Sequence, residues 1–377
     1  MPSAVNYSYP VTVTLVIIAF VLLSTHALPQ FSGIYSDDAE GLENANLPEG
    51  EAQEEILENR DLRDCFTTDL ECPNENVTFH LYTRSNPETP YDLKLDDKSI
   101  RNAPFVKDRP IKILIHGFTG NKDFSPNTEI RPALLEHGDY NVISVDWGKL
   151  AASPCYLQAT YNVEASGKCT AQLIEVLVRN YHVPLKSIHV IGFSLGAQAS
   201  GQVAKYLKEN NVGKLRRITG LDPAMPLFAT LHRSSVLDRS DAHFVDVIHT
   251  NAGNKGKLGP NGHVDFYVNG GTVQPGCAGP EVYDPASCAH ARAPIYYAES
   301  IGTSIGFWGK ECRSWLAFRS NLCDWSTDSI ALMGENADSR KHGQFFLDSQ
   351  SHSPFAMGIE NMYGKNYSPR NANATLK

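Results

Sequence analysis

The sequence predicts an α/β fold with a largely parallel central sheet and helices on both of its faces. From Cys65 onward, short apolar runs rich in β-branched residues alternate with longer segments of helical pattern. One of these runs, residues 188–193, passes almost directly into a helical segment at residue 195. The chain has 377 residues, 42% of them hydrophobic and 20% charged, which is enough to bury a sizeable core.

Seven runs have the composition of buried strands. They are residues 77–83, 111–117, 141–147, 187–193, 216–222, 244–250 and 263–269. Two segments, residues 161–180 and 195–210, have the pattern of helices. The second carries small residues at Ala197, Gly201 and Ala204, so its backbone can lie close against a sheet. In parallel sheets the reacting groups lie in loops beyond the C-terminal ends of the strands.

The N-terminal part differs in composition from the rest. Residues 1–27 carry no charged side chain, and their apolar stretch at 11–23 is short for a membrane span, which is typical of a secretory signal peptide. A signal anchor is the alternative, because no Lys or Arg precedes that stretch. Residues 28–61 hold ten acidic residues and one basic residue, a net charge equal to the −9 of the whole chain. The folded body is therefore near neutral, and its charge points to no particular partner.

The expected organisation is a signal peptide at 1–27, an acidic linker or pro-segment at 28–61, a folded domain at 62–368 and a tail at 369–377. Eight cysteines in an exported chain predict disulfides. The simplest of many connectivities joins near neighbours: Cys65 with Cys72, Cys155 with Cys169, Cys277 with Cys288, and Cys312 with Cys323. No CxxC or His-rich cluster suggests zinc. Sequons predict surface glycans at Asn76, Asn366 and Asn373.

Ser194 stands between Gly192 and Gly196 at the junction of an expected strand and an expected helix. Glycines at these two positions relieve crowding at a sharp bend and leave the serine hydroxyl exposed, which is the nucleophile elbow pattern G-x-S-x-G. A second match surrounds Ser304 in "GTSIG". We interpret that match as a loop coincidence, because no helical run of small residues follows it.

A serine hydroxyl needs a base to take its proton and a carboxylate to orient that base. Asp222 directly follows the expected strand at 216–221, so it is a candidate for the carboxylate, although an Asp-Pro pair also starts turns. The downstream histidines are His232, His243, His249, His263, His290, His342 and His352. Spacing alone does not choose among them. One physical argument favours His290, since a disulfide at Cys288 could hold its loop still.

Acyl transfer also needs two backbone amides to stabilise the developing oxyanion. One is expected from Leu195, the residue after the serine. The other is expected from Phe118, because Gly117 ends a strand and lets the chain approach the serine closely. An ordinary glycine turn is the alternative interpretation of this segment.

Eight short blocks occur in order between Cys65 and Tyr367: "IHGF", "VDW", "IGFSLGAQASG", "ITGLDPA", "LDRSDAHFVDVIHT", "GHVDFYVNGG", "PGC" and "CAHARA". Together they resemble the blocks of the animal pancreatic lipase family, within the AB hydrolase superfamily. The resemblance implies an α/β-hydrolase fold, with Ser194 as nucleophile, Asp222 as orienting acid and His290 as base. It also implies the oxyanion roles of Phe118 and Leu195, and the cysteine spacings resemble the family's, which favours the near-neighbour pairing.

The chain also departs from the classical family pattern. Classical members carry a C-terminal β-sandwich domain, which we do not expect here, and so no colipase partner is expected. Their lid lies between the cysteines that match Cys277 and Cys288, where this chain has the short segment "AGPEVYDPAS". The loop at 251–262 also looks shortened. Asp238 and Asp241 match two carboxylates of the family's calcium loop, so a structural calcium ion is an expectation; no other cofactor is required.

A short lid together with a short loop resembles the phospholipase A1 branch of the family, which includes insect enzymes. The sequence therefore predicts a secreted, monomeric serine ester hydrolase that releases the sn-1 fatty acid of phospholipids at a membrane or micelle surface. A triacylglycerol lipase or galactolipase is the enzymatic alternative. A catalytically inactive lipid carrier, similar to yolk proteins of this fold, is the alternative from another class. No nucleic-acid partner is expected.

Overall fold

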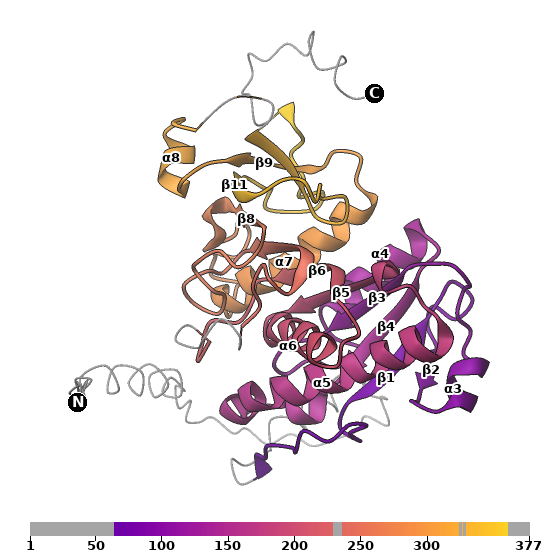
Figure 1. Cartoon of the computed structure of the whole chain (residues 1–377). Coiled ribbons are helices and arrows are strands. Elements are labelled where there is room, and N and C mark those ends of the chain that lie inside the picture. The colour runs from indigo at the N-terminus through magenta and orange to yellow at the C-terminus, as the bar shows by residue number, and fades with distance from the viewer. Residues whose placement is uncertain (1–63, 229–235, 324–325, 327–328, 361–377) are drawn as a thin grey trace, which may run out of the picture. The chain divides into compact units, whose positions relative to one another are not determined.

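A computed structural model describes residues 64–228, 236–323, 326 and 329–360 (Figure 1). The expected signal peptide, the acidic segment, the sequons at Asn366 and Asn373, and the tail lie outside the described residues. No helix in the described ranges combines the length and apolarity that crossing a membrane requires.

The described residues build one 11-stranded sheet in the order β10-β9-β11-β8-β7-β6-β5-β3-β4-β1-β2. Its central strands, from β4 to β8, run parallel, and β11 adds parallel to β8. Antiparallel pairs finish both edges, with β1 on β4 and β9 on β11. The strands are β1 (Thr78–Tyr82), β2 (Tyr91–Leu93), β3 (Ile111–Ile115), β4 (Asn141–Asp146), β5 (Ile188–Phe193), β6 (Leu215–Leu221), β7 (Ala242–His249), β8 (Val264–Val268), β9 (Phe307–Glu311), β10 (Ile330–Met333) and β11 (Gly343–Leu347).

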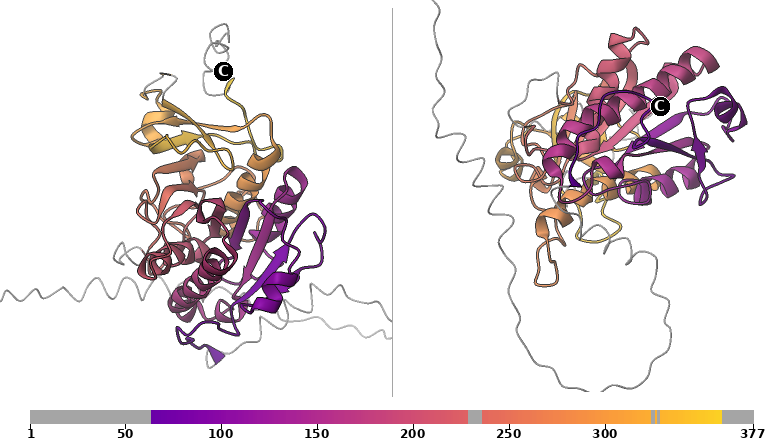
Figure 2. Two further views of the ribbon diagram at one scale, coloured as in Figure 1. Left: turned by 45° about the vertical axis from the view of Figure 1, so that its right-hand side comes forward. Right: turned by 90° about the horizontal axis from the view of Figure 1, so that it is seen from below.

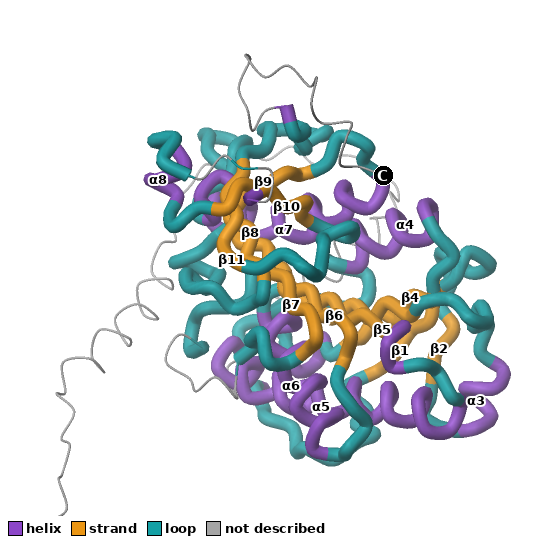
Figure 3. The backbone as a smooth tube through the Cα atoms, turned by 45° about the horizontal axis from the view of Figure 1, so that its top comes forward, coloured by secondary structure: helices purple, strands orange, loops and turns teal. Residues whose placement is uncertain are grey.

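Helices cover both faces of this sheet. The two long helices α5 and α6 pack side by side on one face, while α4 and α7 contact each other on the opposite face (Figures 2 and 3). The helices are α3 (Asp97–Asn102), α4 (Asn127–His137), α5 (Tyr156–Tyr181), α6 (Leu195–Glu209), α7 (Pro285–Gly302) and α8 (Trp315–Arg319). The sheet order and these two layers confirm the predicted α/β-hydrolase fold.

Two hydrophobic clusters fill the layers, and successive residues of β3 show how the sheet divides them. Ile113 and Ile115 belong to the cluster under α5 and α6, whereas Leu114 belongs to the cluster under α4 and α7. This alternation follows from the two-residue period of a strand. Because β3 is buried on both faces, its sequence is continuously apolar apart from Lys112.

All seven expected strands and both expected helices are present. Helix α5 begins earlier than expected, at Tyr156, and ends at Tyr181. Helix α6 begins at Leu195, directly after Ser194, as the elbow pattern requires. Ser304 lies in an exposed bend between α7 and β9, which confirms its interpretation as a loop residue.

All eight cysteines form disulfides, but two of the four predicted pairings are wrong. The bonds are Cys65–Cys155, Cys72–Cys169, Cys277–Cys288 and Cys312–Cys323. Cys155 caps the N-terminus of α5, and Cys169 lies about four turns further along that helix. That separation is roughly 20 Å along the axis, whereas a disulfide needs Cα atoms within about 7 Å.

The segment before β1 explains the observed pairing. It runs alongside α5, where the Asn162 side chain donates to Phe66 O and accepts from Thr68 N, and Gln172 donates to Cys72 O. Each cysteine of the segment therefore meets the helical cysteine next to it, with Cα–Cα distances of 5.3 and 5.2 Å. The two bonds fasten the N-terminal segment to the outside of α5.

Candidate active site

Ser194 occupies the sharp bend between β5 and α6. Its backbone angles are φ 56° and ψ −118°, a region that residues with a Cβ rarely adopt. The amide of Ser194 donates to Leu221 O at 3.0 Å, and its carbonyl accepts from Ala197 N and Ala224 N, each at 3.1 Å. These bonds to the helix and to the segment after β6 hold the strained conformation in place.

The glycines on both sides of Ser194 are required by close backbone packing. A Cβ on Gly192 would lie 2.2 Å from Gly196 O, and a Cβ on Gly196 would lie 2.1 Å from Ile115 O. Gly117 is also packed closely, because a Cβ at this position would lie 2.8 Å from Ser194 Cβ and 3.3 Å from Ser194 Oγ. The loop after β3 therefore lies directly against the serine side chain.

Asp222 and His290 meet at the same edge of the sheet. The Nδ1–H of His290 donates to Asp222 Oδ2 at 2.5 Å. Asp222, at the end of β6, is fully buried, and its other oxygen accepts the amides of Thr250 at 2.9 Å and Asn251 at 3.1 Å. The His290 ring, on α7, packs against Phe193 with ring centroids 4.6 Å apart. The Asp222 carboxylate thus orients the His290 imidazole, which lies beside Phe193, the residue that precedes Ser194.

The other described downstream histidines do not contact Asp222. His249 is buried and bonds to Asp265, while His263 accepts the amide of Val245 through Nδ1. His243, His342 and His352 are exposed. His232 lies outside the described residues. Among the described histidines downstream of Asp222, His290 is the one whose ring bonds to this carboxylate.

Two backbone amides lie close to Ser194, those of Phe118 and Leu195. Within the described residues, neither Phe118 N nor Leu195 N has a hydrogen-bond acceptor. Leu195 N belongs to the first turn of α6, where amides have no intrahelical partner and the helix dipole favours negative charge. Phe118 follows Gly117, and its ring contacts Tyr156 edge-on at 5.0 Å.

His116 anchors the loop that carries Phe118. Its Nδ1–H donates to Gly117 O at 2.9 Å, and its Nε2 accepts the amide of Trp147 at 3.1 Å. The Trp147 indole donates back to His116 O at 3.0 Å. Nearby Asp146 accepts the backbone amides of Gly148 at 2.9 Å and Lys122 at 3.3 Å. The loop is thus fixed from both sides by buried polar contacts.

Comparison with known proteins identifies the family. The family model described as Lipase matches residues 48–355. The pancreatic triacylglycerol lipase of Oryctolagus cuniculus is 37% identical over 309 residues, which cover 74% of this chain and 65% of that protein. The chain belongs to the lipase family.

A second relative shows the limit of this similarity. The inactive pancreatic lipase-related protein 1 of Homo sapiens is 36% identical over 307 residues, covering 74% of this chain and 64% of that protein. The matched residues cover a similar share of both relatives, so this lipase-family chain spans about 65% of the length of these two proteins. Because one relative is named a lipase and the other inactive, the identity alone does not decide whether this chain is catalytic.

Among solved structures, the dienelactone hydrolase from Anabaena variabilis aligns with a TM-score of 0.29 and 10% identity over 48% of this chain and 71% of that one. The fold assignment rests on the sheet order and the family match, not on this alignment.

The expected calcium site stays a prediction. Asp238 N donates to Asp241 Oδ2 at 2.8 Å, so the two carboxylates belong to one turn. Burial, together with the charge of Asp238, raises the pKa of Asp241 to about 7. Calcium binds six to eight oxygens, and no group of three or more ligating side chains occurs in the described part of this lipase-family chain.

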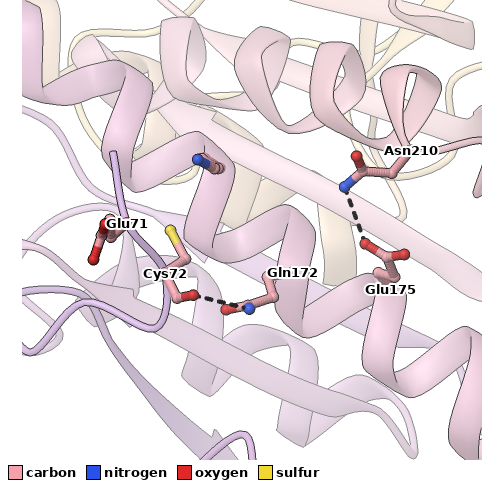
Figure 4. A pocket seen from close by; sticks show the side chains of 6 residues that line it. Glu71, Cys72, Gln172, Glu175 and Asn210 are labelled. Atoms are coloured by element: carbon pink, nitrogen blue, oxygen red, sulfur yellow. Dashed lines mark hydrogen bonds between the residues drawn. The ribbon is translucent and has the colours of Figure 1, made fainter. Parts of the chain in front are cut away.

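One described hollow lies away from Ser194. It has a volume of about 370 Å³ and is lined by Glu71, Cys72, Lys168, Gln172, Glu175 and Asn210 on the outside of α5 (Figure 4). None of the candidate residues around Ser194 lines it. Asn76, the described sequon, sits in a turn just before β1 and is partly exposed, so its glycosylation stays a prediction.

Replacing Gly256 by alanine is expected to disturb the site and lower the melting temperature. The new Cβ would lie 2.4 Å from Asp222 Oδ1 and 2.6 Å from Oδ2, and three hydrogen bonds prevent that carboxylate from moving aside. Overpacking of this kind costs about 1–3 kcal/mol. Gly259→Ala, in the same loop with no atom within 4 Å of its Cβ, is the matched control and should melt like the wild type. Equal melting temperatures for both variants would contradict this packing.

Proposed function

We propose that the chain is a serine carboxylic-ester hydrolase that acts on lipids. The proposal is carried by the 2.5 Å hydrogen bond between His290 Nδ1 and buried Asp222, with the imidazole packed on Phe193, the residue that precedes Ser194 in its strained bend. A carboxylate that fixes the imidazole tautomer leaves Nε2 free to act as a base. The unpartnered amides of Phe118 and Leu195 supply the place where an oxyanion would be stabilised.

In the proposed mechanism, Ser194 Oγ attacks the ester carbonyl while His290 Nε2 takes its proton. Asp222 stabilises the imidazolium that forms, and the two amides stabilise the tetrahedral oxyanion. His290 then protonates the leaving alcohol. A water molecule, activated by the same imidazole, releases the fatty acid and regenerates the Ser194 hydroxyl.

An inactive lipid carrier is the alternative from another class. Such a protein is expected to lack one of the three residues or to hold them apart. Here all three are present, and two of them are already bonded to each other. The strained backbone at Ser194 favours the catalytic interpretation, because strained conformations cluster at active sites, where the surrounding structure maintains them.

Ser194→Ala is expected to abolish ester hydrolysis while the protein stays folded, since the change removes one hydroxyl from a bend that backbone hydrogen bonds hold. Ser304→Ala is the matched control, because it changes the second G-x-S-x-G match in an exposed bend. Hydrolysis of a short-chain p-nitrophenyl ester and circular dichroism should be measured on both. Wild-type turnover in the Ser194 variant, with loss in the Ser304 variant, would contradict the proposal.

We further propose that the substrate is a phospholipid and that the sn-1 ester is cleaved. The disulfide Cys277–Cys288 closes a loop with a sequence separation of 11. Lys255, in the loop after β7, donates to Asp284 Oδ2 at 3.2 Å and to Ser287 Oγ, so the two short loops are tied together. A site beside a short, fastened loop is better suited to a polar headgroup than a site that a long apolar lid covers.

The substrate proposal predicts that phosphatidylcholine is hydrolysed faster than triolein by one preparation, with the fatty acid released from the sn-1 position. Defined mixed-acyl phospholipids in micelles and mass spectrometry of the lysophospholipid product measure this directly. A preference for triolein would favour a triacylglycerol lipase, and a preference for a galactolipid would favour a galactolipase. Either result would leave the serine mechanism intact.

The four disulfides also bear on where the chain is located. Four disulfides form in oxidising compartments, which supports export of the chain. We propose a secreted monomer that meets its substrate at a membrane or micelle surface without colipase.

A further inference from the structure

A second buried histidine–carboxylate pair lies next to the Asp222–His290 pair. His249, the last residue of β7, directs Nε2–H to Asp265 Oδ1 on β8 at 2.9 Å. The exposed fractions of the two side chains are 0% and 1%. The His249 ring also stacks on Tyr267, with centroids 4.3 Å apart and planes within 4°. The mechanism proposed above uses neither residue.

This pair fastens the loop at 250–262 at several points. His249 Nδ1–H donates to Lys257 O at 3.1 Å in the middle of the loop. Asp265 also accepts the amides of Asn261 at 2.8 Å and Gly262 at 3.0 Å, where the loop ends. The start, the middle and the end of the loop are therefore held by one imidazole and one carboxylate.

Both nitrogens of His249 face acceptors, a carbonyl oxygen and a carboxylate oxygen. The ring therefore joins the middle of the loop to Asp265 near the start of β8. Removing one partner of this buried pair leaves polar groups without hydrogen-bond partners, and the surrounding chain must rearrange to satisfy them. The groups nearest to rearrange are the backbone amides that follow His249.

Those amides belong to Thr250 and Asn251, which bind Asp222 Oδ1 at 2.9 and 3.1 Å. They fix the rotation of the Asp222 carboxylate, whose other oxygen receives His290 Nδ1–H. We infer that His249 and Asp265 are positioning residues, which place the Thr250 and Asn251 amides and thereby orient Asp222 and His290 for catalysis. This inference rests on the proposed function.

Asp265→Asn tests the inference, with Asp246→Asn as the matched control. Asp246 lies three residues before His249 on β7, is equally buried, and binds Arg217 through both carboxylate oxygens at 2.8 and 2.9 Å. Both variants remove a buried carboxylate from the same part of the sheet, but Asp246 does not contact the loop that binds Asp222. His249→Gln is a milder second variant, because its amide can still donate to Asp265 while the bond to Lys257 O is lost.

The kinetic readout is kcat per active site, with sites counted by a fluorophosphonate titration. Asp265→Asn is expected to lower kcat about 10- to 100-fold, the range known for loss of a hydrogen-bond partner behind a metal-ligating histidine, with KM changed by less than about twofold. His249→Gln should lie between this variant and the wild type. Asp246→Asn should be less stable yet keep the wild-type kcat per site. Unchanged kcat in both loop variants, or an equal loss in Asp246→Asn, would overturn the inference.

A spectroscopic readout separates this inference from the proposed function. A proton in a short imidazole–carboxylate bond resonates far downfield in the NMR spectrum, and His290→Ala assigns it. That signal should shift or broaden in Asp265→Asn and stay unchanged in Asp246→Asn, whether or not any ester is hydrolysed. An unchanged signal in Asp265→Asn would overturn the inference even if the wild type is an active hydrolase. Absence of hydrolysis by the wild type, with the signal shifted as expected, would instead contradict the proposed function alone.

Discussion

One buried carboxylate, that of Asp222, joins the parts of the chain that make the candidate site. It receives His290 from α7 and two amides from the end of β7, and it packs against Gly256 of the following loop. An isolated carboxylate with no exposure would be too costly to bury, so these donors are needed for stability as well as geometry. Because the imidazole comes from α7 and the two amides come from the end of β7, the carboxylate fixes the relative positions of these two elements.

Much of the central sheet could be predicted from the sequence, because strands buried on both faces read as continuous apolar runs. The elements that sequence reasoning missed lack such a signal. Helix α7 contains Pro285 and Pro294, which obscure its helical pattern. Strand β9 includes Lys310 and Glu311, and it pairs with β10 and β11 near the edge of the sheet, where tertiary context and not local sequence decides the conformation.

The site was predictable in part. The two glycines around Ser194 identify it in the local sequence. The structure gives the reason, because a Cβ at either glycine would collide with a backbone oxygen. His290 lies 68 residues beyond Asp222, a separation closed by tertiary structure, so spacing could not have chosen it. The amides of Thr250 and Asn251 carry no sequence signal, because any residue has a backbone N–H. The wrong disulfide pairing has a structural reason: the predicted helix at 161–180 contained Cys169 but not Cys155, and only the observed start of α5 at Tyr156 places both cysteines far apart along one helix axis.

The account depends most directly on whether Ser194 is an activated nucleophile. Mass spectrometry of the intact protein after treatment with a fluorophosphonate ester tests this without knowledge of the natural substrate. The account predicts a single adduct, located on Ser194 by peptide sequencing, that forms in the wild type and fails to form in His290→Ala. A folded wild-type protein that remains unlabelled, or that carries the adduct on another serine, would contradict it.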